Sequence, residues 1–344
     1  MKVFYSKLHE LHAPQYEFFR GDKVPCFEKP ERAWNVLEEV RSQGHTVLEP
    51  SVDSSSVLTQ VHTDRYIHFL QTAWEQWIAL DPTNASRQPF PSVWPIRSLR
   101  NDPEPDNFIA KYGLYSMDNG TPLVAGTWQA VKSASDCVVS AVKEISAGDR
   151  SVFCATRPPG HHAGKDFMGG YCFLNNAAIA AQEFLNSGAR HVAILDVDYH
   201  HGNGTQSIFY DRADVLYVSI HADPRIEYPF YLGYADETGQ GAGLGCNLNL
   251  PLAGGTPSSL WFDALEKGCS AIDGYKADAL VISLGLDTFG GDPLTKFNLS
   301  SEDFIKLGNR IAMLNKPTVF ILEGGYASTM LGVNACNVLE GFGH

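Results

Sequence analysis

The sequence lacks any C-x-x-C pair, and its seven cysteines are scattered along the chain and odd in number. Cysteine zinc sites and disulfide frameworks both need closely and regularly spaced cysteines, so we expect neither. No apolar run reaches the ~20 residues that span a membrane. The N-terminal stretch MKVFYSKLHELHAP also lacks the apolar core of a secretion signal. These absences predict a cytoplasmic protein in a reducing compartment, without a membrane partner.

Positive charge is also scarce, with 26 lysines and arginines against 39 aspartates and glutamates and a formal net charge of −13. A surface of this sign repels phosphate backbones, so no nucleic-acid partner is expected. It suits a cationic small-molecule substrate, although the same charge can serve solubility alone. The length of 344 residues allows one large domain or two smaller ones.

Apolar runs rich in β-branched residues alternate with helical patterns along most of the chain. The runs are continuously apolar, which predicts strands buried on both faces, at 2–6, 151–156, 191–198, 215–221, 279–287 and 318–326. Helices are predicted at 30–44, 57–77, 127–148, 175–188, 258–275 and 301–314. This alternation predicts an α/β fold in one domain over residues 1–344, with a mostly parallel central β-sheet and helices on both faces.

The segment from Leu80 to Ala125 interrupts the alternation with many prolines, several acids and no sustained periodicity. Loops this long inside a domain are usually functional or disordered. Disordered segments are poor in aromatic residues, whereas this one contains Phe90, Trp94, Phe108, Tyr112 and Tyr115. We expect an ordered insertion, too irregular for a strand or a long helix, whose aromatic residues bury against the partner of a homodimer. A solvated acidic loop is the alternative.

Polar side chains follow the predicted strands at the points where these strands end. Ligands of open α/β sheets bind beyond the carboxyl ends of the strands, so side chains that follow different strands should meet at one rim. The stretch DVDYHHGNG, residues 196–204, supplies several of them. The rim is expected to hold Asp196, Asp198, His200, His221, Asp287, Glu323, Tyr326 and the pair His161–His162.

Three of these residues are candidate metal ligands. Asp198 and His200 lie two positions apart, so on an extended strand both side chains point the same way and can hold one ion. Asp287, from a neighbouring strand, would be a third ligand and leave a coordination position open for water or substrate. An open site with nitrogen and oxygen ligands fits catalytic zinc, although Fe(II), Co(II) and Mn(II) would also bind.

The adjacent histidines are better suited to proton transfer than to metal binding. His161 and His162 follow Pro-Pro-Gly, a stiff turn that can present imidazoles to a reacting water. Each imidazole needs an acceptor to fix its tautomer, and Asp196 and Asn203 are the available ones. Tyr326, after two glycines, is a candidate donor to a developing oxyanion, or simply a buried aromatic residue at a strand end.

Five motifs together resemble the histone deacetylase-like amidohydrolases of the arginase–deacetylase fold: RPPGHHAG, GGYCFLNNAAIA, DVDYHHGNGTQ, SLGLD and LEGGY. The resemblance runs from near the N-terminus to the end of the chain. Within that family, the stretch HADPRIEYPFYLGYADETG and the acidic insertion are most similar to the bacterial acetylpolyamine amidohydrolases.

The resemblance implies roles for individual residues. It implies zinc bound by Asp198, His200 and Asp287, with His162 as general base and acid, His161 as electrostatic helper, and Tyr326 as the group that polarises the carbonyl. It also implies a substrate tunnel lined by the Gly170 carbonyl, Tyr171 and Tyr228. A structural potassium site is implied at Asp196, Asp198, His200, Ser219 and Ile220, and a peripheral one at Phe209, Arg212 and Val215.

One position departs from the family pattern. Many eukaryotic members carry aspartate where this chain has Asn203, and the neutral amide should lower the basicity of His162. The departure argues against a close match to the nuclear, histone-directed members.

We therefore predict a zinc-dependent enzyme that hydrolyses the acetamide of acetylated polyamines such as acetylputrescine, acetylcadaverine and acetylspermidine. The acids of the insertion should line the tunnel mouth and attract the substrate's ammonium group: Asp102, Glu104, Asp106 and Asp118, of which Asp106 and Asp118 are the expected substrate contacts. Three alternatives stay open. They are a protein acetyl-lysine deacetylase, a two-manganese ureohydrolase, which needs further ligands near Tyr199, and a silent binding protein on the same scaffold.

Overall fold

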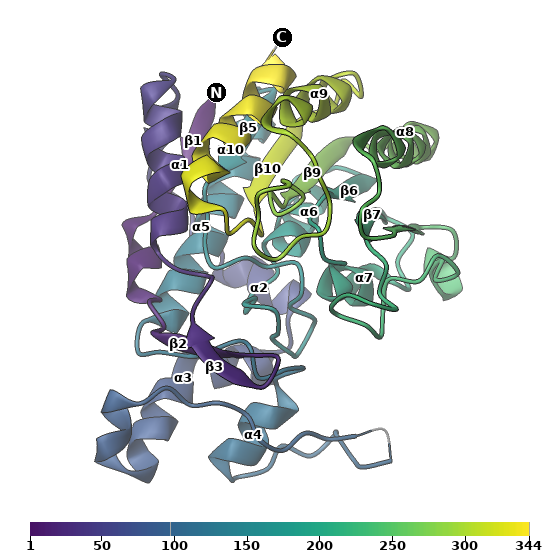
Figure 1. Ribbon diagram of the computed structural model, residues 1–344. Coiled ribbons are helices and arrows are strands. Elements are labelled where there is room, and N and C mark those ends of the chain that lie inside the picture. Colours follow the sequence, from purple (N-terminus) through teal and green to yellow (C-terminus); the bar gives the residue numbers. More distant parts are fainter. Residues whose placement is uncertain (97, 344) are drawn as a thin grey trace.

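Eight parallel strands form the central sheet of the protein, seen here in a computed structural model that describes residues 1–96 and 98–343 (Figure 1). The order across the sheet is β4-β1-β5-β10-β9-β6-β7-β8, and every adjacent pair is parallel. The strands are β1 (Lys2–Phe4), β4 (Thr46–Leu48), β5 (Ser151–Cys154), β6 (Val192–Asp196), β7 (Val215–Ala222), β8 (Asn247–Leu252), β9 (Ala279–Leu284) and β10 (Thr318–Leu322). A separate antiparallel hairpin consists of β2 (Tyr16–Phe19) and β3 (Asp22–Pro25).

All six predicted strands are present, and the sequence missed the two at the edges of the sheet. Strands β6, β9 and β10 are buried along their whole length, as their continuous apolar runs predict. In contrast, β4 has three residues and none is fully buried. Strand β8, with the sequence NLNLPL, mixes asparagine and proline into a half-buried edge, so its apolar signal is weak.

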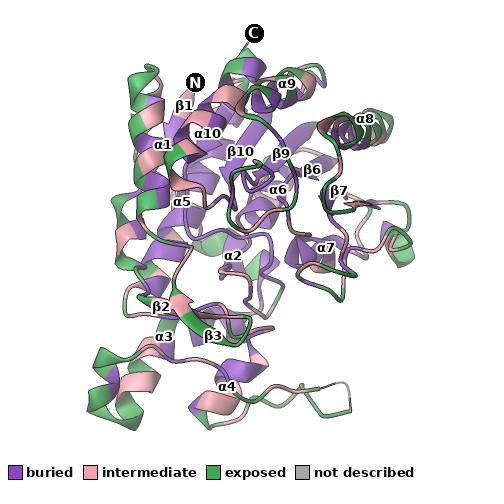
Figure 2. Cartoon of the chain, viewed as in Figure 1, coloured by how far each residue is buried: buried purple, intermediate pink, exposed green. Residues whose placement is uncertain are grey.

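Helices cover both faces of the sheet (Figures 1 and 2). They are α1 (Glu31–Ser42), α2 (Ser55–Val61), α3 (Asp64–Leu80), α4 (Phe108–Leu114), α5 (Thr127–Ser146), α6 (Asn176–Asn186), α7 (Asn203–Phe209), α8 (Ser258–Tyr275), α9 (Ser301–Ala312) and α10 (Ser328–Gly343). Short 3-10 helices are η1 (Lys7–Leu11), η2 (Pro82–Ser86) and η3 (Gly241–Gly243). Helix α10 was not predicted, because its glycines and asparagines weaken the helical signal.

The hydrophobic core has two layers, one on each face of the sheet. Apolar residues of α2, α3, α5 and α6 pack on one face, and those of α1, α8, α9 and α10 pack on the other. Successive strand residues alternate between the layers, since Ile194 belongs to the first and Leu195 to the second. The predicted single α/β domain with helices on both faces is confirmed.

The helix predicted at 57–77 is instead two helices, α2 and α3. His62 between them is extended, with φ −113° and ψ 152°. A neighbouring loop holds the break, because the ring nitrogen Nδ1 of His62 lies 2.8 Å from the carbonyl oxygen of Gly164 and the amide of Thr63 donates to the carbonyl of Lys165. These tertiary hydrogen bonds replace helical ones, which periodicity cannot reveal.

The insertion at about 80–125 is ordered, but three of its aromatic residues need no partner subunit. Phe108, Tyr112 and Tyr115 are buried within the chain, and each contacts the ring of Phe69 on α3. The expectation that a partner buries these rings is therefore wrong, because α3 already does so. The exposed apolar side chains of the insertion are instead Leu80, Val93, Ile96 and Leu99.

Candidate active site

Asp198, His200 and Asp287 converge at the carboxyl edge of the sheet. Their ligand atoms all lie within 4.8 Å of one another. The Nδ1 atom of His200 lies 3.3 Å from Oδ1 of Asp198 and 3.1 Å from Oδ2 of Asp287. The convergence follows from the pairing of β6 with β9, because these residues lie in the loops that follow the two strands.

Asp198 and His200 do meet, but the prediction that they point the same way on one extended strand is wrong. Strand β6 ends at Asp196, so neither residue lies on an extended strand whose side chains alternate. The loop after the strand is shaped instead by hydrogen bonds from the His200 amide to Oδ1 of Asp198 and from the Gly324 amide to its Oδ2. A Cβ at Gly324 would lie 2.5 Å from Oδ2 of Asp198, so only glycine fits there.

The chemistry of this group suits a divalent cation. Asp198 and Asp287 are both buried, and burial together with the charge of Asp198 raises the pKa of Asp287 to about 7. Two buried carboxylates are costly side by side unless a cation neutralises them. Two carboxylate oxygens and one imidazole nitrogen form a donor set that transition metals accept.

The two adjacent histidines make the hydrogen bonds predicted for them. Nδ1 of His161 lies 3.1 Å from Oδ2 of Asp196, and Nδ1 of His162 lies 2.7 Å from Oδ1 of Asn203, the first residue of α7. The hydroxyl of Tyr217 donates to the same Asp196 oxygen at 2.9 Å, a contact that the sequence did not indicate. The imidazole rings are buried, with centroids 4.0 Å apart.

The surroundings push the pKa values of the two histidines in opposite directions. Burial disfavours a charged imidazole at His161, but the carboxylates of Asp198 and Asp196 outweigh it and raise its pKa to about 10. Burial, followed by the positive charge of His161, holds the pKa of His162 well below its usual range. One imidazole is thus kept charged and the other neutral, a separation typical of acid–base sites.

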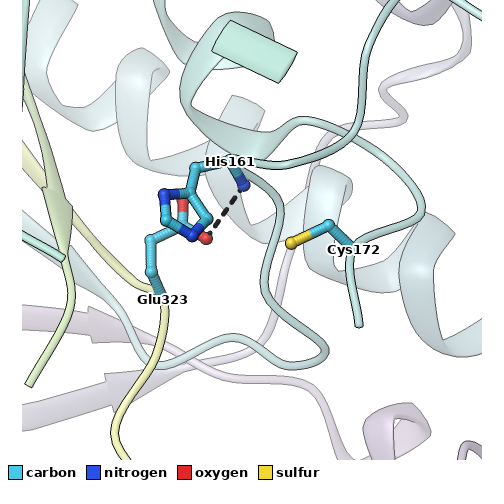
Figure 3. A group of neighbouring side chains, drawn as sticks. All are labelled: His161, Cys172 and Glu323. Carbon is cyan, nitrogen blue, oxygen red and sulfur yellow. Dashed lines mark hydrogen bonds between the residues drawn. The ribbon is translucent and has the colours of Figure 1, made fainter. Parts of the chain in front are cut away.

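Glu323 holds the turn that carries the histidines. Its Oε2 accepts the backbone amides of Gly160 at 2.6 Å and His161 at 3.2 Å, and the latter bond is drawn in Figure 3. Cys172 lies beside this contact, so His161, Cys172 and Glu323 form a second buried group whose ligand atoms lie within 4.8 Å of one another. Because Glu323 is already engaged by two amides, its role here is to position the His161–His162 turn.

Tyr326 is held from two sides. Its backbone amide donates to Oδ2 of Asp292 at 2.5 Å, and the guanidinium of Arg32 lies 4.8 Å from its ring centroid. Arg32, on α1, also donates to the carbonyl oxygens of Glu323 at 2.5 Å and Gly325 at 2.6 Å. Arg32 and Asp292 thereby fix the loop after β10, and no motif in the sequence indicated either residue.

A cavity of about 750 Å³ leads to these groups, and His162, His200 and Tyr326 lie in its wall. Gly170, Tyr171 and Tyr228 also line it, as expected. The ring of Tyr228 meets that of His162 edge-on with centroids 4.9 Å apart, while Tyr171 packs against Tyr326 at 5.7 Å. Gly170 has φ +53°, and a Cβ there would lie 2.3 Å from the His162 ring. Glycine at this position therefore lets the wall approach the imidazole.

Only one of the two acids predicted to contact substrate lies at the cavity. Asp118 lines the cavity, whereas Asp106 is exposed and is not among the cavity residues. Glu17 on β2 was missed, yet it is buried in the cavity wall and accepts a hydrogen bond from the Tyr171 hydroxyl at 2.8 Å. Burial raises the pKa of Glu17 to about 7. Of the remaining insertion acids, Asp102 pairs with Arg100 and Glu104 with Lys111.

Comparison with known proteins agrees with this geometry. Residues 26–342 match the family described as the histone deacetylase domain. The chain belongs to the histone deacetylase family. The acetylpolyamine amidohydrolases 2 and 1 of Pseudomonas aeruginosa are 52% and 53% identical to it, covering 99% of this chain and 98% and 99% of their own lengths. A crystal structure of the acetylpolyamine aminohydrolase from Burkholderia pseudomallei matches with a TM-score of 0.94 at 36% identity, covering 100% of this chain and 98% of that one.

Membership in the histone deacetylase family confirms the resemblance drawn from the motifs and makes the chain an amidohydrolase. It also disfavours the silent binding protein. Tyr199, where a ureohydrolase would need a further ligand, is instead a buried ring packed edge-on against Phe297. No helix in the described part of the chain is long and apolar enough to cross a membrane.

The first predicted potassium site shares Asp198 and His200 with the candidate metal ligands, and its other residues lie on β6 and β7. Asp196, at the end of β6, is the register partner of Ser219 on β7, and Ile220 follows. His221, expected at the rim, is buried, with Nδ1 2.8 Å from the Ser219 hydroxyl. Phe209 and Val215 flank the turn between α7 and β7 that holds Arg212. Both potassium sites stay predictions.

Proposed function

We propose that this amidohydrolase removes the acetyl group from acetylated polyamines, releasing acetate and the free polyamine. One observation carries the proposal. A single cavity joins the buried carboxylate of Glu17 and that of Asp118 to the Asp198–His200–Asp287 group and the His162–Asn203 pair. The acidic residues of the cavity wall suit an ammonium group, and the metal candidates and the His162–Asn203 pair suit amide hydrolysis.

Asp198, His200 and Asp287 would hold the metal, for which we propose zinc, with Fe(II) or Co(II) as substitutes. When bound, the ion would lower the pKa of a water molecule towards ~7 and polarise the amide carbonyl. The proposal is supported by the donor set, two carboxylates and an imidazole whose ligand atoms lie within 4.8 Å.

His162 would carry the proton. The Asn203 oxygen 2.7 Å from Nδ1 can only accept, so Nδ1 carries hydrogen and Nε2 is left with a lone pair. A neutral imidazole can take a proton from the attacking water at Nε2 and return it to the departing amine. The charged His161 would stabilise negative charge that develops beside it, with Asp196 fixing its orientation.

Tyr326 would donate its phenol to the oxygen of the scissile carbonyl. Burial raises the pKa of Tyr326 well above its usual range, so the hydroxyl keeps its proton at neutral pH. Loss of one such donor typically reduces turnover by about 10²–10³. Gly170, Tyr171 and Tyr228 would line the tunnel around the acyl group and its neighbouring methylenes.

An acetylated polyamine fits the cavity better than a neutral amide. Asp118 places negative charge in the wall, and Glu17, whose pKa is raised to about 7, adds to it once it is ionised, so an ammonium group would be attracted to the wall. The relatives from Pseudomonas aeruginosa, which are acetylpolyamine amidohydrolases, support the same substrate class. Because Asp106 lies outside the cavity of its own chain, it would reach substrate only across a dimer interface.

We further propose a cytoplasmic homodimer with a structural potassium ion. Asp196, Asp198, His200, Ser219 and Ile220 would bind the potassium, and the exposed apolar side chains of the insertion would meet the partner. Val93 and Ile96 are 59% and 63% exposed, and such exposed apolar side chains support an interface at the insertion.

Elemental analysis of purified variants tests the metal assignment. Wild-type protein should contain one transition-metal ion per chain, and Asp198→Ala and Asp287→Ala should lose it. His161→Ala is the matched control, because it removes a buried neighbour of Asp198 that is not a proposed ligand. Its metal content should stay close to that of the wild type while acetate release falls. Undiminished metal in Asp287→Ala would refute the assignment.

A further inference from the structure

An ion pair between Glu227 and Lys296 lies in the wall of the active-site cavity. The two residues come from different loops, the first after β7 and the second between β9 and α9. The side chain of Glu227 is only 14% exposed, whereas that of Lys296 is 53% exposed. A largely buried carboxylate in a cavity thus has a half-exposed lysine as its ion-pair partner.

The backbone of Glu227 is fixed relative to the catalytic groups. The amide of Glu227 donates to the carbonyl of Asp223 at 3.0 Å, and its own carbonyl accepts the amide of Phe230 at 3.1 Å. The next residue, Tyr228, is the wall residue whose ring meets His162. Glu227 therefore sits on a held turn directly beside the part of the wall that faces the reacting groups.

Glu227 differs from the other two carboxylates of the cavity in what binds it. Asp118 accepts four hydrogen bonds, from Gly120, Thr121, Gly170 and Tyr228. Glu17 accepts from Tyr171 and from the amide of Phe27. The donors from Gly120, Gly170, Tyr171 and Tyr228 belong to the cavity wall and cannot leave without disturbing it. Lys296 can leave, because its ammonium ends a flexible and partly solvated side chain.

We propose that Glu227 binds the distal ammonium group of longer substrates, and that Lys296 occupies this position in the free enzyme as a built-in competitor. The inference rests on the proposed polyamine deacetylation and adds a specificity-determining pair to it. Exchange of one ammonium for another keeps the charge of Glu227 neutralised throughout. A substrate with a neutral tail cannot make the exchange, and a diamine too short to span from the reacting groups to the carboxylate should gain nothing from it.

The experiment compares Michaelis constants for two substrate series at about 0.15 M salt, where exposed charges act over only about 8 Å. One series is monoacetylated diamines with increasing numbers of methylenes, and the other is neutral N-alkylacetamides of the same lengths. Glu227→Gln should raise KM for the longer diamines by about two- to fivefold, the range of a partly exposed ion pair. Lys296→Met should lower it by a similar factor. In the double variant, the Lys296 change should no longer lower KM.

Neutral amides should be unaffected in both variants, and Glu266→Gln serves as the matched control. Glu266 pairs with Arg310 between α8 and α9 and does not line the cavity. Equal shifts for cationic and neutral substrates, or shifts independent of diamine length, would overturn the inference. A wild-type preference for acetylated diamines that survives Glu227→Gln unchanged would overturn the inference alone. A wild type with no such preference would overturn the proposed function as well.

Discussion

Replacing Asp118 by asparagine should lower the free energy of unfolding by about 2–5 kcal/mol, because one acceptor oxygen used by two donors is lost. The Oδ1 atom accepts the Gly120 amide at 3.0 Å and the Thr121 hydroxyl at 3.1 Å. The Oδ2 atom accepts the Gly170 amide and the Tyr228 hydroxyl, both at 2.7 Å. An asparagine side chain keeps one acceptor oxygen, so in either orientation two donors face an amide NH₂ group.

For a chain of 344 residues, this loss corresponds to a fall in Tm of about 3–7 °C. Thermal unfolding followed by circular dichroism measures it. Gly170 and Tyr228 also flank His162, so kcat/KM should fall along with the stability, by up to about 10²-fold if the wall shifts by ~1 Å.

Asp106→Asn is the matched control, since both acids belong to the same insertion. Asp106 is exposed and has no hydrogen bond or ion pair among residues 1–96 and 98–343, so its replacement should change stability by less than about 0.5 kcal/mol. Equal Tm values for the two variants would refute the reasoning from the Asp118 contacts.

Three further predictions concern the histidines, Glu17 and the insertion. At matched metal content, His162→Ala should lose about 10²–10⁴ in turnover and His161→Ala less, since only the first moves the proton; equal losses would contradict the assignment. Folding raises the pKa of Glu17 from 4.5 to about 7. Between these pH values the folded state binds a proton that the unfolded state has released, so the free energy of unfolding should fall as pH rises from about 4.5 to 7. Glu17→Gln should flatten this slope in pH-dependent urea unfolding, and an unchanged slope would disprove the titration. Wild-type protein should have the solution mass of a dimer that Val93→Ser with Ile96→Ser weakens, whereas a monomeric wild type would disprove the interface.

The central part of the fold was predictable because its signal is local. Strands such as β6 and β9 are continuous apolar runs, and their burial on both faces follows directly from composition. The break at His62 was not predictable, because hydrogen bonds to a loop about 100 residues away create it. Edge strands β4 and β8 carry too little apolar surface to stand out.

The active site also has a part that was predictable from the sequence and a part that was not. Residues that follow strands, such as Asp198 and Asp287, were predictable, because parallel strands bring their carboxyl ends to one edge. Residues that reach the site from elsewhere were not. Arg32 comes from the buried face of α1 and Glu17 from a separate hairpin, and only the tertiary arrangement brings them to Tyr326 and Tyr171.

The most direct test of the account is a comparison of kcat/KM for three substrates by enzyme reconstituted with zinc, and then with Fe(II) or Co(II). The substrates are a monoacetylated diamine, a neutral N-alkylacetamide of the same length and an acetyl-lysine peptide. We expect the acetylated diamine to be hydrolysed with the highest kcat/KM, because its ammonium group is attracted to the acidic cavity wall and the acetyl-lysine side chain of the peptide carries no such group. Equal or faster hydrolysis of the peptide would contradict the account and favour a protein deacetylase instead.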